Sequence, residues 1–315
     1  MPVSDRALRA GLAEVMGQDV ELLERFPLAD ASSFPIERVE VTAGGQDISL
    51  VFKDSSPALA PGHSGGVKPT FVLGPAREIE AYRHVIGPAA IDAPRCHGSI
   101  SDPRGGRFWL FLEHVEGELL WRIGDLAIWE EAARWLADLH GRALPAGGAG
   151  LLRYDADWFR TWLPRATSTP AGASLRRLAA RWDHVVDRLC EWPVSLIHGE
   201  FYPSNVLVQR TESFVRVRPV DWEMAGIGPG LLDLAALTAG GWTEGQRRRL
   251  AEAYFSAWPE RLARPDRHDF AVALDHCRLH LAVQWSGWSP GWSPPPDHAQ
   301  DWLGEALRLA DQLGI

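Results

Sequence analysis

The chain has 315 residues, of which 46% are hydrophobic, and this length allows one to three domains with a substantial core. Its formal net charge of −9 argues against a nucleic-acid or anionic-membrane surface, which would need a basic patch. Three widely separated cysteines predict neither a disulfide framework nor a zinc site. The N-terminus lacks an apolar signal segment, and the apolar runs are shorter than the roughly 18 residues that span a membrane, so we expect a cytoplasmic protein.

The first part of the chain predicts a helix followed by a two-stranded hairpin. Residues 4–25 carry apolar side chains at helical spacing and predict a packed N-terminal helix. Residues 34–41 and 48–53 are strand-like, and the turn between them contains Gly44 and Gly45. Most Gly-Gly turns only connect the strands of a hairpin, but small residues also let backbone N–H groups approach phosphates.

The second of these strands ends at Lys53, which is one of only two lysines in the chain. A lysine at this position can reach the phosphates of a nucleotide that lies under the turn. The simpler alternative is a solvated strand end, and Lys68 is the other candidate, although it lies in a loop rich in Ser, Pro and Gly. A helix that opens at Pro75 follows and contains two acids, Glu78 and Glu80.

Residues 107–114 predict another short apolar strand, and the remainder of the chain is mainly helical by its periodicity. We expect helices over residues 129–140, 175–189, 268–285 and 301–313. Thr243 and Gln246 have the spacing of a capping box that opens a further helix.

Several polar side chains of this helical part have both structural and functional interpretations. Asp155 and Asp157 stand among aromatic residues, where they either cap a helix or hold a cationic group of a substrate. We expect His140 to pack at a helix end rather than to act in catalysis. His276 and His280 have the i, i+4 spacing of a metal site, but no HExxH motif accompanies them, so we do not expect zinc there.

Trp285, Trp288 and Trp292 lie in a segment rich in Pro, Gly and Ser, which we expect not to form a regular helix. Their rings either line a pocket for a sugar or aromatic substrate, or pin a loop to the core.

The strongest functional signal is a set of polar residues in the second half of the chain. His198, Glu200 and Asn205 follow the spacing H-x-acid-x-x-x-x-N, and Asp221 follows a later apolar run. In kinases, a catalytic acid and a metal-binding asparagine have this spacing and precede a metal-binding aspartate.

The segment between Asn205 and Asp221 predicts a hairpin, with strand-like residues 206–208 and 214–220 around a polar turn. Because a hairpin brings its two ends together, Asn205 and Asp221 should face the same small volume. An amide oxygen beside a carboxylate suits Mg²⁺, which prefers oxygen ligands and takes phosphate oxygens as its others.

Further residues indicate which kind of kinase the chain resembles. Gly199 after the histidine, the D-W-E turn that begins at Asp221 and the later G-x-G-P-x-x-x-D-L-A motif resemble the aminoglycoside phosphotransferase family of small-molecule kinases. The motifs cover about residues 36–240. One departure is Glu200, where that family usually has Asp; the additional methylene lengthens the side chain, but its carboxylate can still accept a proton from a hydroxyl.

The resemblance implies an α+β, protein-kinase-like fold with two lobes. Residues 1–116 would form a nucleotide-binding N-lobe with an antiparallel sheet and a helix. Residues 117–315 would form a mostly helical C-lobe that carries the catalytic loop and the substrate-binding helices.

The resemblance also implies roles for residues of both lobes. Lys53 would orient the phosphates of ATP, and Glu78, which stands four residues before a tyrosine, would hold the lysine in place. Backbone groups around Glu113 and Val115 would meet the adenine edge, and Asp233 would support the catalytic loop.

The expected function is transfer of the γ-phosphoryl group of ATP to a hydroxyl of a small molecule, such as an antibiotic, a sugar or an amino alcohol. The candidate catalytic residues are His198, Glu200, Asn205 and Asp221. Asn205 and Asp221 would hold Mg²⁺, and Glu200, in the loop that His198 opens, would position the hydroxyl and accept its proton. The alternatives are a catalytically impaired pseudokinase that binds a nucleotide or metabolite, and transfer of a nucleotidyl unit. The sequence leaves open the acceptor, the choice between ATP and GTP, and the oligomeric state.

Overall fold

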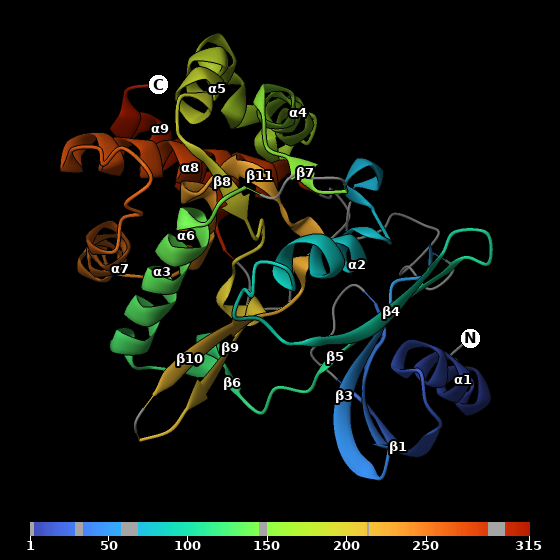
Figure 1. The fold of residues 1–315 in the computed structure, drawn as a ribbon. Helices are drawn as coiled ribbons and strands as arrows, with labels where there is room; N and C mark the ends of the chain where they lie inside the picture. The colour runs from blue at the N-terminus through green and yellow to red at the C-terminus, as the bar shows by residue number, and fades with distance from the viewer. Residues whose placement is uncertain (1–2, 29–33, 58–68, 145–149, 213, 289–299) are drawn as a thin grey trace.

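The computed structural model describes residues 3–28, 34–57, 69–144, 150–212, 214–288 and 300–315. In Figure 1 these residues form an N-terminal part built on a sheet and a mostly helical C-terminal part. Helix α2 (Arg77–Ala81) lies between the two parts. None of the described helices is long and apolar enough to cross a membrane.

A five-stranded antiparallel sheet forms the N-terminal part, in the order β1-β2-β3-β5-β4. The strands are β1 (Val20–Pro27), β2 (Ile36–Ala43), β3 (Gln46–Asp54), β4 (Cys96–Asp102) and β5 (Arg107–Glu113). Successive side chains of β5 point to opposite faces of the sheet. Trp109 and Phe111 join the smaller core under α1 (Asp5–Met16), whereas Leu110 and Leu112 join the core shared with α2 and the C-terminal part.

The N-terminal helix is shorter than predicted. It ends at Met16, because Gly17 adopts a left-handed conformation (φ 66°) and its N–H donates to the carbonyl of Ala13. The residues expected to continue it form β1, the edge strand beside β2. The prediction over residues 4–25 was therefore wrong beyond Met16.

The C-terminal part contains seven α-helices among its described residues. They are α3 (Leu126–Gly141), α4 (Ala156–Thr167), α5 (Trp182–Cys190), α6 (Leu231–Leu237), α7 (Glu244–Ser256), α8 (Arg267–Trp288) and α9 (Trp302–Leu313). In Figure 1, α8 runs behind the small strands, and α4, α6 and α9 pack against it.

Two small sheets carry the loops that matter for function, in the orders β10-β9-β6 and β7-β11-β8. Their strands are β6 (Glu118–Leu119), β7 (Leu152–Arg153), β8 (Val194–Ile197), β9 (Val206–Arg210), β10 (Val215–Pro219) and β11 (Gly226–Pro229). The predicted boundary between residues 1–116 and 117–315 falls between β5 and β6, which belong to different sheets.

Two expectations about the C-terminal helices were wrong. Residues 175–189 do not form one helix: a 3₁₀ segment (Ala171–Ala180) precedes α5, and both bury an apolar face. Helix α8 continues through Trp285 to Trp288, because these rings pack against other aromatic side chains despite the Ser and Gly between them. Trp292 lies outside the described residues.

Local capping agrees with the sequence in three places. Asp155 accepts a hydrogen bond from the Trp158 N–H and caps α4, so the structure favours the capping interpretation for this acid. Thr243 and Gln246 form the predicted capping box of α7. Asp301 caps α9 through the Gly304 N–H.

His280 is a buried histidine in the middle of α8. Its Nε2 lies 3.2 Å from the Gln284 side-chain oxygen, whereas its Nδ1 is buried with no hydrogen-bond partner among the described residues. Burial lowers the pKa of this imidazole to about 3. His280 is therefore neutral in the folded protein at neutral pH.

We predict that His280→Leu weakens the acid sensitivity of folding. The unfolded chain binds a proton at His280 near pH 6.5, but the folded chain does not until about pH 3, so stability is lost as pH falls below 6.5. At pH 5 this one group costs about 2 kcal/mol relative to neutral pH. Urea denaturation at pH 7 and pH 5 should show a decrease smaller by about that amount in the variant; an equal decrease would contradict the assignment.

Candidate active site

A buried lysine joins the two parts of the molecule. Lys53, near the end of β3, lies 2.6 Å from a carboxylate oxygen of Glu78 on α2 and 2.5 Å from one of Asp221. Burial alone would lower the pKa of Lys53, but the carboxylates of Asp221 and Glu78 outweigh burial and hold that pKa well above its usual range. The lysine is therefore charged, and it is shared between two acids that lie far apart in the sequence.

Glu78 has a second partner that fixes the position of α2. Its other carboxylate oxygen accepts a hydrogen bond from the backbone N–H of Trp222, at 3.1 Å. Trp222 opens a 3₁₀ turn (Trp222–Met224) directly after Asp221, and its ring is fully buried. Of the two acids considered from the sequence, Glu78 is thus the one that meets Lys53, whereas Glu80 lies 3.1 Å from His84.

A buried acid on α6 holds the loop after β8 through hydrogen bonds. Asp233 accepts hydrogen bonds from the backbone N–H groups of His198 (2.7 Å) and Gly199 (2.8 Å). Its carboxylate also lies 3.3 Å from the imidazole of His140, whose other ring nitrogen meets the Tyr254 hydroxyl. Asp233 therefore supports the loop, and His140 packs beneath it instead of reaching the site.

His198 links this loop to the strand that precedes Asp221. Its Nδ1 accepts the N–H of Glu200, so its Nε2 carries the proton and donates it to the Val220 carbonyl at 3.0 Å. Burial lowers the pKa of His198, which favours this neutral form. The geometry makes His198 a residue that positions the loop, since both ring nitrogens are used in hydrogen bonds to the backbone.

Gly199 cannot be replaced without distortion. It adopts φ 83°, and a Cβ at this position would collide with the Met224 carbonyl oxygen and the Tyr154 hydroxyl. These two groups are hydrogen-bonded to each other at 2.8 Å. The glycine that follows His198 in the motif is therefore required by the close packing of the loop.

The hairpin predicted between Asn205 and Asp221 is present. Strands β9 and β10 pair antiparallel with Val206 opposite Pro219, and the Val220 N–H donates to the Asn205 carbonyl at 2.9 Å. The Asn205 side-chain amide donates to the Glu200 carbonyl at 3.0 Å, which leaves its oxygen as the end that can serve as a ligand.

Three carboxylates converge at the end of this hairpin. Oxygen atoms of Glu200, Asp221 and Glu223 all lie within 4.8 Å of one another. Asp221 adopts a left-handed conformation (φ 65°), and the 3₁₀ turn that follows brings Glu223 back to the same point. Sequence reasoning missed Glu223, although an acid two residues after a metal-binding Asp is a signal that could have found it.

The clustered oxygen atoms of this site suit a divalent cation. Among the described residues, the carboxylates of Glu200, Asp221 and Glu223 lie together, and Lys53 contacts Asp221. Such a set of hard oxygen ligands suits Mg²⁺. The residues present therefore fit the ion that the sequence predicted, with Glu223 added to the candidate ligands.

Arg77 is a second residue that sequence reasoning missed. It precedes Glu78 on α2, and its Nη1 donates to the backbone carbonyls of Glu223 and Val72, both at 2.8 Å. Burial lowers the pKa of this arginine, although nearby acidic groups, including Glu223 and Glu200, oppose the shift. Arg77 therefore ties the start of α2 to the acidic turn.

The structure does not bring Gly44 and Gly45 to Lys53. They form the two-residue turn between β2 and β3, with φ 58° and 78°, and Lys53 lies seven positions along β3 from Gln46, the neighbour of Gly45. At about 3.3 Å per residue this distance is roughly 23 Å, too far for a shared phosphate group. The prediction that Gly44 and Gly45 contact the phosphates was therefore wrong.

The described ends of the connection between β1 and β2 lie at the end of the sheet that carries Lys53. Ile36 pairs with Lys53, and Pro27 pairs with Glu37, so this connection leaves and re-enters the sheet beside the lysine. It contains Ala, Ser and Asp and no glycine, which is why sequence reasoning passed over it. Residues 29–33 lie outside the described residues.

Some backbone groups of the segment expected to contact adenine already form hydrogen bonds within the protein. The N–H groups of Glu113 and His114 donate to the carbonyls of Arg95 and Ser49, so these donors are not available to a nucleotide. The Glu113 carboxylate is held by Arg218 of β10, at 2.5 Å. Contact of the nucleotide with Glu113 and Val115 stays a prediction, restricted to the remaining backbone groups.

Comparison with known proteins agrees with this site. A model of a phosphotransferase enzyme family matches residues 37–270. The chain belongs to this family. Comparison with curated protein sequences gave no match.

Solved structures of two phosphotransferases and a choline kinase share the fold at low sequence identity. The apoenzyme of macrolide 2'-phosphotransferase MphH from Brachybacterium faecium is 17% identical, with a TM-score of 0.58 over 89% of this chain and 91% of that one. The GDP and kanamycin complex of APH(2")-IIia is 16% identical, with a TM-score of 0.58 over 97% of both chains. Choline kinase LicA from Streptococcus pneumoniae is 13% identical, with a TM-score of 0.58 over 98% of both chains. The predicted α+β, protein-kinase-like fold is thus confirmed.

We predict that Lys53→Met destabilises the folded protein by about 3 kcal/mol, because it leaves the buried Glu78 carboxylate without its counter-charge. The double variant Lys53→Met/Glu78→Met removes that charge as well and should recover about half of the loss. Urea denaturation of the three proteins at pH 7 measures both effects. A single variant as stable as the wild type would show that the ion pair does not matter for folding.

Proposed function

We propose that this phosphotransferase-family protein transfers the γ-phosphoryl group of ATP to a hydroxyl of a small molecule. The observation that carries the proposal is the buried Lys53, held by Glu78 and directed at Asp221, which opens the cluster of three carboxylates. A lysine charge beside clustered oxygen ligands is the arrangement that phosphoryl transfer needs, since most of its catalysis is positioning and charge stabilisation.

Each side chain of the cluster has a role that follows from its position. Lys53 binds phosphate oxygens of the nucleotide, and Glu78 keeps the ammonium group at the end of β3. Asp221, Asn205 and Glu223 would hold Mg²⁺, which would supply positive charge to neutralise the phosphate groups.

Glu200 is placed to receive the proton of the acceptor. The acceptor oxygen forms a bond to the γ-phosphorus, the bond from phosphorus to the bridging oxygen of ADP breaks, and the hydroxyl proton passes to the Glu200 carboxylate. Its side chain is buried beside Asp221 and Glu223, and its carbonyl anchors Asn205. The longer side chain therefore still ends in the cluster.

The ligands named for proteins of the same fold support a nucleotide donor and a small-molecule acceptor. Relatives of the same fold were solved with GDP or with ADP, which supports a nucleotide site in this chain. Other relatives are named as macrolide phosphotransferase and choline kinase, so a small-molecule acceptor is the common element.

We predict that ATP stabilises the wild-type protein only when Mg²⁺ is present. At about 100 times its dissociation constant, ATP with Mg²⁺ should add roughly 2.7 kcal/mol to the free energy of unfolding. Asp221→Asn should abolish this gain, whereas Glu212→Gln, on the exposed turn after β9, should keep it. Thermal unfolding of the three proteins provides the measurement, and a full gain in the Asp221 variant would remove Asp221 from the metal site.

We predict that Glu200→Ala lowers kcat by about 10³-fold, because the acceptor loses its base, whereas Glu200→Asp keeps a larger share of activity. ADP release with a panel of hydroxyl compounds measures both variants, and product mass separates phosphate transfer from nucleotidyl transfer. Near-normal turnover by the Ala variant would remove Glu200 from the mechanism. Nucleotide binding without turnover of any compound in the wild type would instead support a binding protein.

A further inference from the structure

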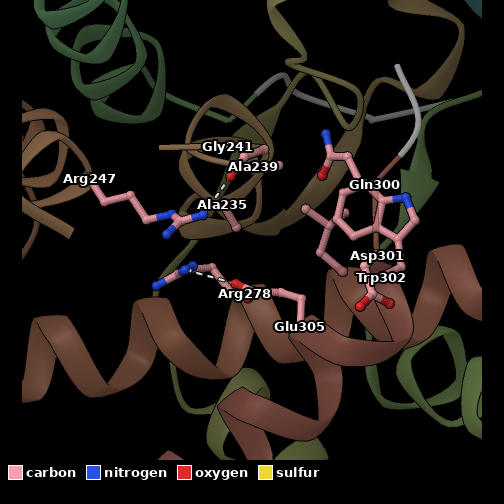
Figure 2. A pocket seen from close by; sticks show the side chains of 11 residues that line it. Ala235, Ala239, Gly241, Arg247, Arg278, Gln300, Asp301, Trp302 and Glu305 are labelled. Carbon is pink, nitrogen blue, oxygen red and sulfur yellow. Dashed lines mark hydrogen bonds and ion pairs between the residues drawn. The ribbon is translucent and has the colours of Figure 1, made fainter. Parts of the chain in front are cut away.

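A second pocket lies among the C-terminal helices, apart from the carboxylate cluster. It has a volume of about 300 Å³ and is bounded by the end of α6, the start of α7, the middle of α8 and the start of α9. Figure 2 shows Arg247 and Arg278 on one side of this pocket and Gln300 and Trp302 on the other. No role assigned so far uses these side chains.

The acidic side chains of this pocket already have partners. Glu305 accepts from Arg278 at 2.8 Å and from Arg308 at 2.9 Å, and Arg278 is also held by Asp275 at 3.0 Å. Asp301 accepts the Gly304 N–H at the start of α9. Each acid therefore neutralises a neighbouring arginine or caps a helix.

Arg247 differs from the other arginine of the pocket. Within the described residues, its hydrogen bonds go to the backbone carbonyls of Gly240 (2.6 Å) and Thr238 (3.4 Å), and no carboxylate lies within ion-pair distance. Burial lowers the pKa of Arg247, and the nearby charges of Arg278 and Arg308 lower it further, against the opposite effects of Glu305 and Glu244. A partly buried guanidinium without an acidic partner is suited to an anionic ligand, since its planar fork of donors matches a carboxylate or phosphate.

An aromatic wall connects this pocket to the catalytic loop. Trp302 stacks on Trp285, with ring centroids 5.8 Å apart and an interplanar angle of 14°. The Trp285 indole N–H donates to the Tyr202 hydroxyl at 2.5 Å, and the Tyr202 N–H donates to the Glu200 carbonyl at 2.7 Å. Three rings therefore lead from the pocket to the residue proposed as the base.

Helix α6 makes a second connection between the two places. Asp233 holds the catalytic loop, and Ala235, two residues later, lines the pocket. Side chains two residues apart on an α-helix point to nearly opposite sides, so α6 contacts the catalytic loop with one face and the pocket with another.

We propose that this pocket binds the anionic group of the acceptor, through Arg247, and that the acceptor is a hydroxy acid or a phosphorylated alcohol. The identity of the ligand as the acceptor rests on the proposed function, whereas the anion site itself does not. Trp302 and Gln300 form the opposite wall and contact the neutral body of the molecule.

The anion site is tested without turnover by ¹⁹F NMR, with trifluoroacetate as the probe and inorganic phosphate as the competitor. The trifluoroacetate signal should broaden with the wild type and with Lys53→Met, but not with Arg247→Gln. Arg248→Gln is the matched control, because Arg248 is the exposed next residue of α7 and does not line the pocket.

A second variant guards against a folding defect of Arg247→Gln. Ala239→Leu fills the pocket and leaves Arg247 in place, so it should also abolish the broadening. Phosphate that displaces the probe at lower concentration than acetate favours a phosphorylated ligand, and the reverse order favours a carboxylate. No broadening with the wild type, or equal broadening with Arg247→Gln and Ala239→Leu, would overturn the anion site.

The acceptor assignment is tested by ADP release with pairs of compounds that differ only in a carboxylate or its amide. The wild type should use the hydroxy acids with kcat/KM at least about 10-fold above the amides, and Arg247→Gln should lose this preference while it keeps turnover of the amides. Equal use of both forms by the wild type would overturn the assignment. Absence of ADP with every compound would contradict the proposed function, and the NMR result would then still decide whether the pocket binds an anion.

Discussion

The structure depends on one lysine that is shared by two carboxylates. Lys53 comes from the N-terminal sheet, Glu78 from the helix between the two parts, and Asp221 from the end of a C-terminal hairpin. Each of these charges would be costly to bury alone, so each holds the others in place. Because Glu78 also accepts the Trp222 N–H, the same acid sets the position of the turn that carries the metal candidates. The same interactions therefore fix both the relative position of the two parts and the geometry of the site.

The sequence predicted those parts of the site that depend on short-range geometry. The hairpin between Asn205 and Asp221 follows from strand and turn residues, and its two ends must meet. Glu223 and Arg77 were missed for different reasons. Glu223 reaches the cluster only because Asp221 takes a left-handed conformation, and Arg77 acts through backbone carbonyls that leave no mark in the sequence. The error at Gly44 has a further cause: a turn can be recognised locally, but the end of the sheet on which it lies depends on β1, which was read as helix.

The sequence predicted helix boundaries correctly where a local capping residue sets them. It mispredicted them where packing against other elements sets the end of the helix. The capping box at Thr243 and the cap at Asp301 involve residues three apart, so their chemistry is visible in the sequence. The continuation of α8 to Trp288 is different, since Ser and Gly weaken the helix and only ring contacts with other elements stabilise it. The pocket beside Arg247 could not be predicted either, because its four walls come from four helices.

Arg218 has a consequence for motion between the N-terminal and C-terminal parts. It projects from the hairpin that leads to Asp221, it is almost fully buried, and it lies within ion-pair distance of the carboxylates of Glu113 and Asp92. A rotation that separated Arg218 from both acids would leave a buried guanidinium without a carboxylate partner, which is strongly unfavourable. The axis of any opening and closing must therefore pass close to these ion pairs. The far edge of the N-terminal sheet would then travel furthest, while the segment beside Glu113 would act as a fixed pivot.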